Sequence, residues 1–280
     1  MDRSRYRVYR IPKARGGFRE IMAPDPELKS QQRRILAWLM ARRIRPSKYA
    51  HGFVKRRSTA THARLHTGRK VIVRIDIKDF FPSITERQVL AALLKEKVPR
   101  DVAQRIADVC TVEGRTPQGA PTSPFLSNVV FKRADYRLAG LARKWKATYS
   151  RYADDLIFSS DSPKLNHIYH AVRAILEDEG YRINEKKFQV CRSGNRQLVT
   201  GVVVNTKASL SRTARRILRA AIHNAREAVI AGNDPPVSLR VLEGKAAYLS
   251  GINREHGSIA LRGLKEVRSL ITMRRRLLAQ

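Results

Sequence analysis

Two adjacent carboxylates, Asp154 and Asp155, stand between stretches of β-forming residues at 148–152 and 156–160. Adjacent acids repel each other, and a pair of divalent cations is a common reason for a fold to bring them together at a tight turn. An ordinary hairpin turn explains the same dipeptide, because aspartate is a frequent turn residue. Taken alone, the pair favours the simple turn over a metal site.

A third acid, Asp76, changes this balance. It lies in the strand-like segment 71–77, where alternation places it on the same face as Ile72 and Arg74. A carboxylate inside such a strand is costly to bury unless it is paired or bound to a metal. Asp76 and the hairpin pair therefore have to be considered together.

One acid on a strand and two at a hairpin are the minimum set for two-metal phosphoryl transfer. In that chemistry one ion activates a hydroxyl and the other steadies the leaving pyrophosphate, with the ions about 3.5–4 Å apart. Magnesium suits all-oxygen ligands and leaves positions for substrate phosphates. We predict that Asp76, Asp154 and Asp155 are catalytic residues that hold two Mg²⁺ ions, for which Mn²⁺ is the alternative.

The charge of the chain indicates a polyanionic partner. The 280 residues include 57 Lys and Arg against 24 Asp and Glu, a formal net charge of +33. A surface this basic repels itself unless a polyanion neutralises it, and nucleic acid is the default candidate. A ribosomal or histone-like protein that binds by charge alone is the competing interpretation. The excess runs along the whole chain, however, which indicates a channel or a wrapped surface.

Other features of the composition exclude further classes of protein. Hydrophobic residues make up 42% of the chain, as in globular rather than disordered proteins. No apolar run is long enough to span a membrane, and the N-terminus lacks the apolar core of a secretory signal. Cys110 and Cys191 have no zinc-ligand spacing. We therefore expect a cytoplasmic protein with reduced cysteines and no membrane partner.

The elements that must position the acids alternate between β and helical patterns. Residues 6–11 and 18–23 predict a hairpin that turns at 14–17, and Asp25-Pro26-Glu27 begins a capped helix. Thr85-Glu86-Arg87-Gln88 is a capping box that begins another helix. We expect further helices at 100–111, from about 124 to 144, at 165–180, 209–231, 237–251 and 258–278, with a break at Gly257, and short strands at 187–191 and 197–204. The best boundary between domains lies near Asn205.

Four segments, in this order along the chain, resemble the conserved motifs of reverse transcriptases. They are RIDIKDFFPSI at 74–84 (motif A), PQGAPTSPFLSN at 117–128 (motif B), RYADDLIFS at 151–159 (motif C) and GYRINEKK at 180–187 (motif D). One such motif would be weak evidence, but four in the family's order are strong evidence, and the resemblance covers nearly the whole chain. The chain is therefore identified as similar to the RNA-directed DNA polymerases.

Within this family the chain resembles the bacterial retron enzymes, which belong to the branch that is like group II introns. The triplet Val199-Thr200-Gly201 is typical of retrons, and Ala153 is typical of bacterial enzymes. Retrons also show an Asn-Ala-x-x-His element before motif A. Here the element runs from His62 to His66, with His62 in place of the asparagine, which puts its detailed role in doubt.

The resemblance implies an α+β fold of the right-hand polymerase type. Fingers and palm, an antiparallel sheet with helices, would occupy residues 1–204, and a helical RNA-binding thumb would occupy 205–280. The fingers would comprise about 1–70 and part of 85–120, and the palm about 71–84 and 121–204.

The resemblance also implies roles for single residues. Lys187 would donate a proton to pyrophosphate, with Lys186 as its competitor, and either Phe80 or Phe81 would exclude a ribose 2′-hydroxyl. The full nucleotide-binding set is Lys13, Arg19, Phe80, Phe81, Gln118, Gly119 and Lys187. The RNA-binding set is His62, His66, Arg212, Arg215, Arg216, Arg219, Arg274, Arg275 and Arg276. A solvated cation is the plain alternative for each Lys and Arg.

A retron-type enzyme copies a structured non-coding RNA into DNA from dNTPs. The resemblance implies priming from an RNA 2′-hydroxyl, a branched RNA–DNA product (msDNA), template removal by a host RNase H, a separate effector protein and a role in anti-phage defence. Three alternatives stay open. A group II intron enzyme would carry an added maturase region, and a diversity-generating enzyme would depart from the motif B string. A catalytically idle RNA-binding scaffold would not need the three acids.

Overall fold

The computed structural model describes residues 2–13 and 16–277. The chain forms two compact units, one of residues 1–58 with 70–191 and the other of residues 59–69 with 192–280. The second unit therefore includes a short segment that precedes motif A in sequence. This division does not test the fingers, palm and thumb assignment, which remains a prediction.

The first unit is built on an antiparallel sheet with the strand order β4-β5-β3-β6. The strands are β3 (Val71–Asp76), β4 (Thr148–Tyr152), β5 (Asp155–Ser160) and β6 (Gln189–Arg192). The central strand β5 pairs with both β3 and β4, and it is buried along its whole length. Both of its faces are therefore covered by other parts of the unit.

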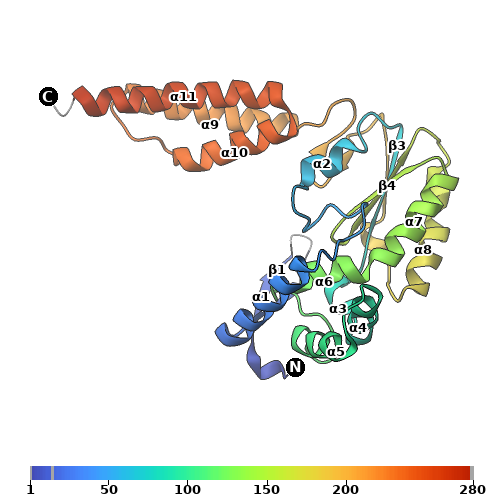
Figure 1. The fold of residues 1–280 in the computed structure, drawn as a ribbon. Coiled ribbons are helices and arrows are strands. Elements are labelled where there is room, and N and C mark those ends of the chain that lie inside the picture. Colours follow the sequence, from blue (N-terminus) through green and yellow to red (C-terminus); the bar gives the residue numbers. More distant parts are fainter. Residues whose placement is uncertain (1, 14–15, 278–280) are drawn as a thin grey trace. The chain divides into compact units, whose positions relative to one another are not determined.

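Helices cover this sheet, and Figure 1 shows α7 and α8 side by side against it. The helices of the unit are η1 (Arg3–Arg5), α1 (Pro26–Ala41), α3 (Phe80–Ser83), α4 (Glu86–Lys95), α5 (Arg100–Cys110), α6 (Ser123–Val130), α7 (Lys132–Lys144), η2 (Leu165–His167), α8 (Ile168–Asp178) and η3 (Glu185–Lys187). One core joins the sheet to α4–α8, with Val73, Ile75, Leu138 and Phe158 fully buried in it. The prediction of an α+β fold with an antiparallel sheet is confirmed.

The local signals in the sequence produce the helix starts that they predict. The Asp25 side chain accepts a hydrogen bond from the Leu28 N–H at 2.7 Å, with Pro26 in the first turn. Thr85 and Gln88 form both halves of a capping box. These contacts satisfy amide groups that have no partner within the helix, so both helices begin where the sequence indicates.

An N-terminal hairpin precedes α1. It consists of β1 (Tyr6–Pro12) and β2 (Phe18–Pro24), paired antiparallel from Tyr6 with Pro24 to Pro12 with Phe18. The predicted hairpin is confirmed, and Ala14 and Arg15 of its predicted turn lie outside the described residues. Buried Tyr6 and Met22 join its base to α1, while the strands are otherwise mostly exposed.

The second unit is mainly helical. It contains α2 (Thr59–Arg64), β7 (Leu198–Val199), β8 (Val202–Val203), α9 (Arg212–Ile230), α10 (Leu239–Ile252) and α11 (Arg254–Leu277). Figure 1 shows α9, α10 and α11 packed side by side, around a core that includes Leu218, Leu242 and Leu264. This bundle has the apolar faces that the helical periodicity predicts.

Two details of the second unit differ from the sequence prediction. Gly257 was expected to separate the last two helices, but α11 begins at Arg254 and includes Gly257. A Cβ atom there would lie 2.2 Å from the Ser250 Cα, so glycine allows α11 to pack closely against α10. The segment 197–204 is a tight hairpin, because Thr200 and Gly201 have φ of 47° and 81° and turn β7 into β8.

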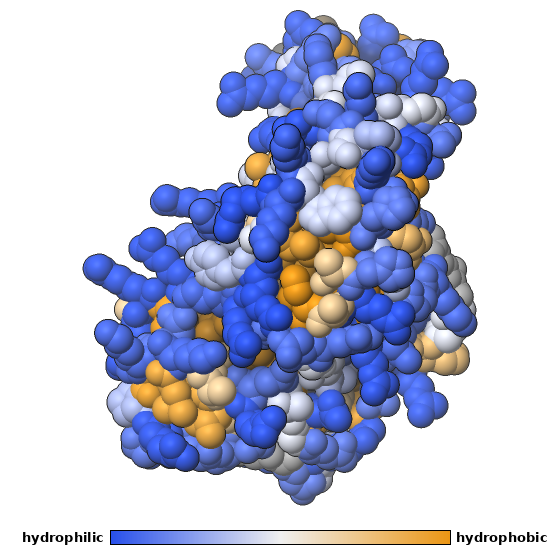
Figure 2. Space-filling view, turned by 90° about the vertical axis from the view of Figure 1, so that its right-hand side faces the viewer, coloured by the Kyte–Doolittle hydropathy of each residue, from blue (hydrophilic) through white to orange (hydrophobic). Residues whose placement is uncertain are grey.

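The surface is dominated by hydrophilic residues. Figure 2 shows them over most of the face drawn, with hydrophobic residues in separate small patches. Within residues 2–13 and 16–277, no helix is long and apolar enough to cross a membrane. Hydrophilic side chains therefore make up most of the face that Figure 2 draws.

Candidate functional site

The register of the sheet brings the three predicted acids together. Asp76 at the end of β3 lies directly opposite Asp155 at the start of β5. Tyr152 pairs with Asp155 across the β4–β5 hairpin, so Ala153 and Asp154 form its two-residue turn. Ala153 has a φ of 55°, a backbone conformation that suits such turns. The sequence motifs A and C therefore meet at one edge of the sheet.

Each of the two paired acids already contacts a cation of the protein. Lys187 Nζ lies 2.8 Å from Asp76 Oδ2, and Arg74 Nε lies 2.6 Å from Asp155 Oδ1. The Asp76 and Asp155 side chains are almost completely buried, whereas that of Lys187 is 41% exposed. Lys187, rather than Lys186, is thus the motif D lysine at the acids.

Burial, helped by repulsion between carboxylates, raises the pKa of Asp154 and of Asp155. Burial raises the pKa of the Asp154 carboxyl to about 6, with further repulsion from Asp76 and Asp155. Burial also raises the pKa of Asp155, against the opposing effect of Arg74. Mutual repulsion of this kind requires the carboxylates to be close in space. The site is therefore short of positive charge, although the whole chain is strongly basic.

The donor chemistry of the three acids fits hard divalent cations such as Mg²⁺, which prefer carboxylate oxygens. Within the part of the chain that the structure describes, no three His, Cys, Asp or Glu side chains are already grouped as metal ligands. Lys187 and Arg74 each take up an oxygen of Asp76 and Asp155, respectively. A divalent cation would have to displace these contacts. The Lys187 side chain is partly exposed, so it can move away from Asp76.

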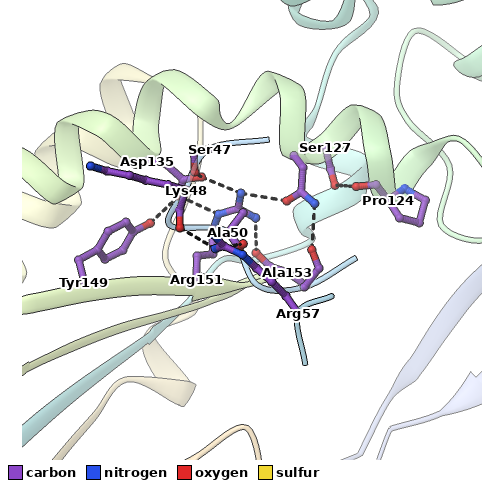
Figure 3. Close-up of polar contacts among 12 residues, drawn as sticks. Ser47, Lys48, Ala50, Arg57, Pro124, Ser127, Asp135, Tyr149, Arg151 and Ala153 are labelled. Carbon is purple, nitrogen blue, oxygen red and sulfur yellow. Dashed lines mark hydrogen bonds and ion pairs between the residues drawn. The ribbon is translucent and has the colours of Figure 1, made fainter. Parts of the chain in front are cut away.

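A buried polar network supports the turn that carries Asp154 (Figure 3). The Arg151 guanidinium donates from Nε and Nη2 to the two carboxylate oxygens of Asp135 in α7, at 2.9 and 2.8 Å. Its Nη1 donates to the Ala153 carbonyl at 2.9 Å, and its Nη2 also donates to the Asn128 side-chain oxygen at 3.0 Å. Arg151 and Asp135 are completely buried. This pair thus joins motif C to α7 and fixes the backbone next to Asp154.

Residues 51–52, which precede motif A in the sequence, also support the β4–β5 turn. His51 N–H donates to the Arg151 carbonyl at 2.7 Å, and the Gly52 carbonyl accepts from Asn128 Nδ2 at 2.9 Å. A Cβ atom on Gly52 would lie 2.6 Å from the Ala153 nitrogen, so only glycine fits against the turn.

The sequence reasoning missed the residues of this network. A signal was present, because Arg151 interrupts a β-type segment and Asp135 lies on the apolar face of a predicted helix. Two opposite charges at positions that periodicity assigns to the core indicate a buried pair. Gly52 had no local signal, because its need for a missing Cβ arises only from contact with the distant turn.

The structure separates the two phenylalanines of motif A. Phe80 is buried against Phe131 and Tyr181. Phe81 is partly exposed, and the centre of its ring lies 6.1 Å from the centre of the exposed Phe53 ring. Of the two, only Phe81 is open to a ligand at this site.

The motif B residues Gln118 and Gly119 lie in the loop before α6. The Gln118 carbonyl accepts from the Met22 N–H at 2.7 Å, and a Cβ on Gly119 would lie 2.8 Å from the Met22 oxygen. The missing Cβ thus lets the loop pack against β2. Lys13 and Arg19 are exposed on the same N-terminal hairpin.

The predicted RNA-binding residues fall into different environments of the second unit. His62 and His66 are fully buried, with their rings 5.7 Å apart. Arg215 is half-buried and lies 2.8 Å from His256, whereas Arg212, Arg216 and Arg219 are exposed. Arg274 donates to the Asn233 carbonyl, next to exposed Arg275 and Arg276. RNA binding remains a prediction for all of them, and for the two histidines it rests on the resemblance alone.

The sequence profile of the family "Reverse transcriptase (RNA-dependent DNA polymerase)" matches residues 11–224. The chain is 40% identical over 269 residues to the retron Mx65 reverse transcriptase of Myxococcus xanthus, a match that covers 89% of this chain and 62% of that protein. It is 33% identical over 224 residues to the retron Ec86 reverse transcriptase of Escherichia coli, covering 79% of this chain and 70% of that protein. The chain belongs to the retron reverse transcriptase family.

Solved structures support the fold of this retron reverse transcriptase. A telomerase from Candida albicans, determined with a fragment of telomeric RNA, matches 94% of the chain and 63% of the telomerase at a TM-score of 0.55 and 10% identity. The predicted right-hand polymerase fold is thereby confirmed. The chain spans less than two thirds of the length of its Myxococcus relatives.

The buried pair of Arg151 and Asp135 predicts a large loss of stability when it is broken. We expect Arg151→Met to lower the free energy of unfolding by about 3–5 kcal/mol, because it leaves Asp135 charged and uncompensated in the core. Arg151→Met combined with Asp135→Asn should cost less than the single change, since no charge stays buried. Urea unfolding followed by circular dichroism measures both.

The matched control is Arg105→Met, which breaks the exposed Arg105–Asp101 pair in α5. It should change stability by less than about 1 kcal/mol, as exposed pairs usually do. Equal effects of Arg151→Met and Arg105→Met would contradict the role given to the buried pair.

Proposed function

We propose that the chain is an RNA-directed DNA polymerase that joins nucleotides by a two-metal mechanism. The observation that carries this proposal is the meeting of Asp76, Asp154 and Asp155 at the end of β3 and the β4–β5 turn. Family membership supports the choice of nucleotidyl transfer among the reactions that such an acid set serves. The strong basic charge supports a nucleic acid template.

In the proposed reaction the three aspartates hold two Mg²⁺ ions, or Mn²⁺ in their place. When bound, the ions would activate the primer hydroxyl and stabilise the charge on the leaving pyrophosphate. Lys187 lies at Asp76 on a partly exposed side chain, so it can turn toward pyrophosphate and donate a proton. Lys13 and Arg19 on the exposed hairpin would contact the triphosphate, and Gln118 and Gly119 would line the nucleotide site.

We assign the exclusion of ribonucleotides to Phe81. Phe80 is buried in the core, whereas Phe81, which follows it in α3 shortly after β3, is only partly buried. A rigid ring at this point would meet a 2′-hydroxyl sterically and leave a deoxyribose in place.

The proposed template is a structured non-coding RNA, as the retron family suggests. Priming from a 2′-hydroxyl of that RNA would give a branched RNA–DNA product, and the exposed arginines of α9 and α11 would hold the RNA by its phosphates. The proposal also includes removal of the template by a host RNase H and a separate effector protein. The enzyme would act in anti-phage defence, in the bacterial cytoplasm.

Removing one acid tests the catalytic part. Asp154→Asn should reduce extension of oligo(dT) on poly(rA), with Mg²⁺ and dTTP, on the order of 10³-fold, equivalent to about 4 kcal/mol of transition-state stabilisation. Asp161→Asn, an exposed acid after β5, is the control and should leave the rate unchanged. Undiminished extension by Asp154→Asn, or no extension by the native protein, would sink the polymerase assignment and favour an idle RNA-binding scaffold.

Replacing the motif A ring tests the gate. Phe81→Ala should lower the preference for dTTP over UTP by about 10–100-fold, the range for losing one shape-determining contact. The measurement is kcat/KM for each nucleotide. Phe80→Leu is the matched control and should lower thermal stability while keeping the preference. The opposite pattern between the two variants would move the gate to Phe80.

The nucleic acid that copurifies with the protein tests the retron-type start. We expect DNA joined to RNA through a 2′–5′ bond, which a debranching enzyme separates into two strands on a denaturing gel. The Asp154→Asn protein should retain the RNA without the attached DNA. Linear DNA from the active protein would contradict the branched product and leave polymerase activity itself standing.

A further inference from the structure

The outer surface of α1 and the segment after it, residues 28–48, carries an unusual concentration of positive charge. These 21 residues include seven cations and no acid. The cations are Lys29, Arg33, Arg34, Arg42, Arg43, Arg45 and Lys48, and every one is exposed. We call this set, together with Trp38, the α1 basic surface.

The carboxylates of the protein leave the α1 basic surface uncompensated. Within residues 2–13 and 16–277, none of its seven cations forms an ion pair with an acid. Some exposed cations elsewhere in the same unit do have an acid partner, for example Arg105 with Asp101 and Arg173 with Glu177. Repulsion among unpaired cations on one surface favours the binding of an external anion.

An exposed tryptophan lies among these cations. Trp38 is 37% exposed, and the Arg42 guanidinium lies over its ring at 4.8 Å from the ring centre. Arg34, Trp38 and Arg42 follow at four-residue intervals and so lie along one side of the helix. The opposite side of α1 holds the buried contacts, because Gln32 donates to the Tyr6 hydroxyl and to the Val109 carbonyl in α5.

On the solvent-facing side of α1, small side chains lie between the arginines. Ser30, Ala37 and Ala41 are exposed and lie between the arginines on the helical wheel. A phosphate backbone can approach the helix closely over such residues, with arginines on both sides to bind it. Arg42 also donates to the carbonyl of Lys97, which brings another exposed cation next to the same end of α1.

We propose that the α1 basic surface is a second RNA-binding surface, which contacts the phosphates of a stem and stacks one unpaired base against Trp38 and Arg42. Exposed arginines alone fit a solvated charged face, whereas a partly exposed indole with an arginine over its ring also offers a flat surface on which a base can stack. Stacking on an aromatic ring next to arginine is how proteins hold unpaired bases. The choice of RNA over DNA rests on the proposed function, whereas the need for a polyanion rests on the unpaired cations.

The first experiment measures the phosphate contacts. The probe is a 12-base-pair RNA hairpin with a single-stranded 3′ tail of ten adenosines, and binding is followed by fluorescence anisotropy from 50 to 200 mM KCl. Arg33→Ala/Arg34→Ala should flatten the slope of log Kd against log salt by about 1.4–1.8, as expected for two lost phosphate contacts. Arg105→Ala/Arg173→Ala removes the same charge from paired sites of the same unit and should flatten it much less. Equal slopes for the two double variants would overturn the proposal.

The second experiment isolates the stacked base. Trp38→Ala should weaken binding of the tailed hairpin by about 5–100-fold, the range for losing one stacked base, and leave the blunt hairpin unaffected. Trp38→Phe keeps a ring and should restore most of the affinity. Ultraviolet crosslinking of the native complex should attach the adenosine tail to the peptide that contains Trp38. An equal loss on both hairpins, a crosslink elsewhere, or tighter binding of the same hairpin made of DNA would each overturn the proposal.

Binding is measured without dNTPs, so it does not depend on polymerase activity. Extension of oligo(dT) on poly(rA) should stay within twofold of native for Trp38→Ala, because Trp38 has no part in the proposed catalytic site. Loss of that activity would show that the variant damages the fold. The conservative Trp38→Phe and Arg33→Lys/Arg34→Lys variants then decide, since they must retain the binding that the alanine variants lose.

Discussion

The buried ion pair between Arg151 and Asp135 is the contact on which the rest of the first unit depends. Both side chains are completely removed from water, which costs several kcal/mol per ion before any interaction is formed. The cost is offset by two hydrogen bonds between the pair, and by bonds to Asp135 from Tyr149 and Ser47. Such a network is stable in one arrangement only, so it fixes α7, β4 and the segment near residue 50 together.

That arrangement determines where the acids lie. Arg151 also donates to the Ala153 carbonyl, one peptide before Asp154. The antiparallel register then sets Asp76 against Asp155. Three carboxylates would repel each other at this distance, and the protein moderates the repulsion with Arg74 on one side and Lys187 on the other. The surrounding hydrogen bonds and ion pairs thus hold the three carboxylates in place, and the carboxylates together still attract cations.

Charge is distributed unevenly over the chain. On α5, α7 and α8 several arginines, among them Arg105, Arg137 and Arg173, have carboxylate partners. On α1 and along the outer side of α9 they project to solvent as unpaired groups. Both kinds of surface are basic in the sequence, but only the unpaired kind attracts a polyanion strongly. The distinction between them is a property of neighbouring elements rather than of composition.

The sequence by itself indicated most of the elements and singled out the three acids. The capping box at Thr85, the helix start at Asp25 and the alternation of 71–77 are local signals, and the hydrogen bonds that they produce are local too. The motifs with Asp76 and Asp154 were recognisable for the same reason, since each lies within a few residues of chain.

The tertiary structure decided the contacts between residues that are distant in sequence. Gly257 and Gly119 lack a Cβ because of close packing against Ser250 and Met22, which no local pattern reveals. Phe80 and Phe81 are alike in sequence, and only the core around Phe131 assigns one to burial and the other to the site. The buried position of the His62 ring likewise comes from its neighbours in the second unit. Burial and pairing arise from the whole fold, whereas helices, strands and motifs are determined by short stretches of sequence.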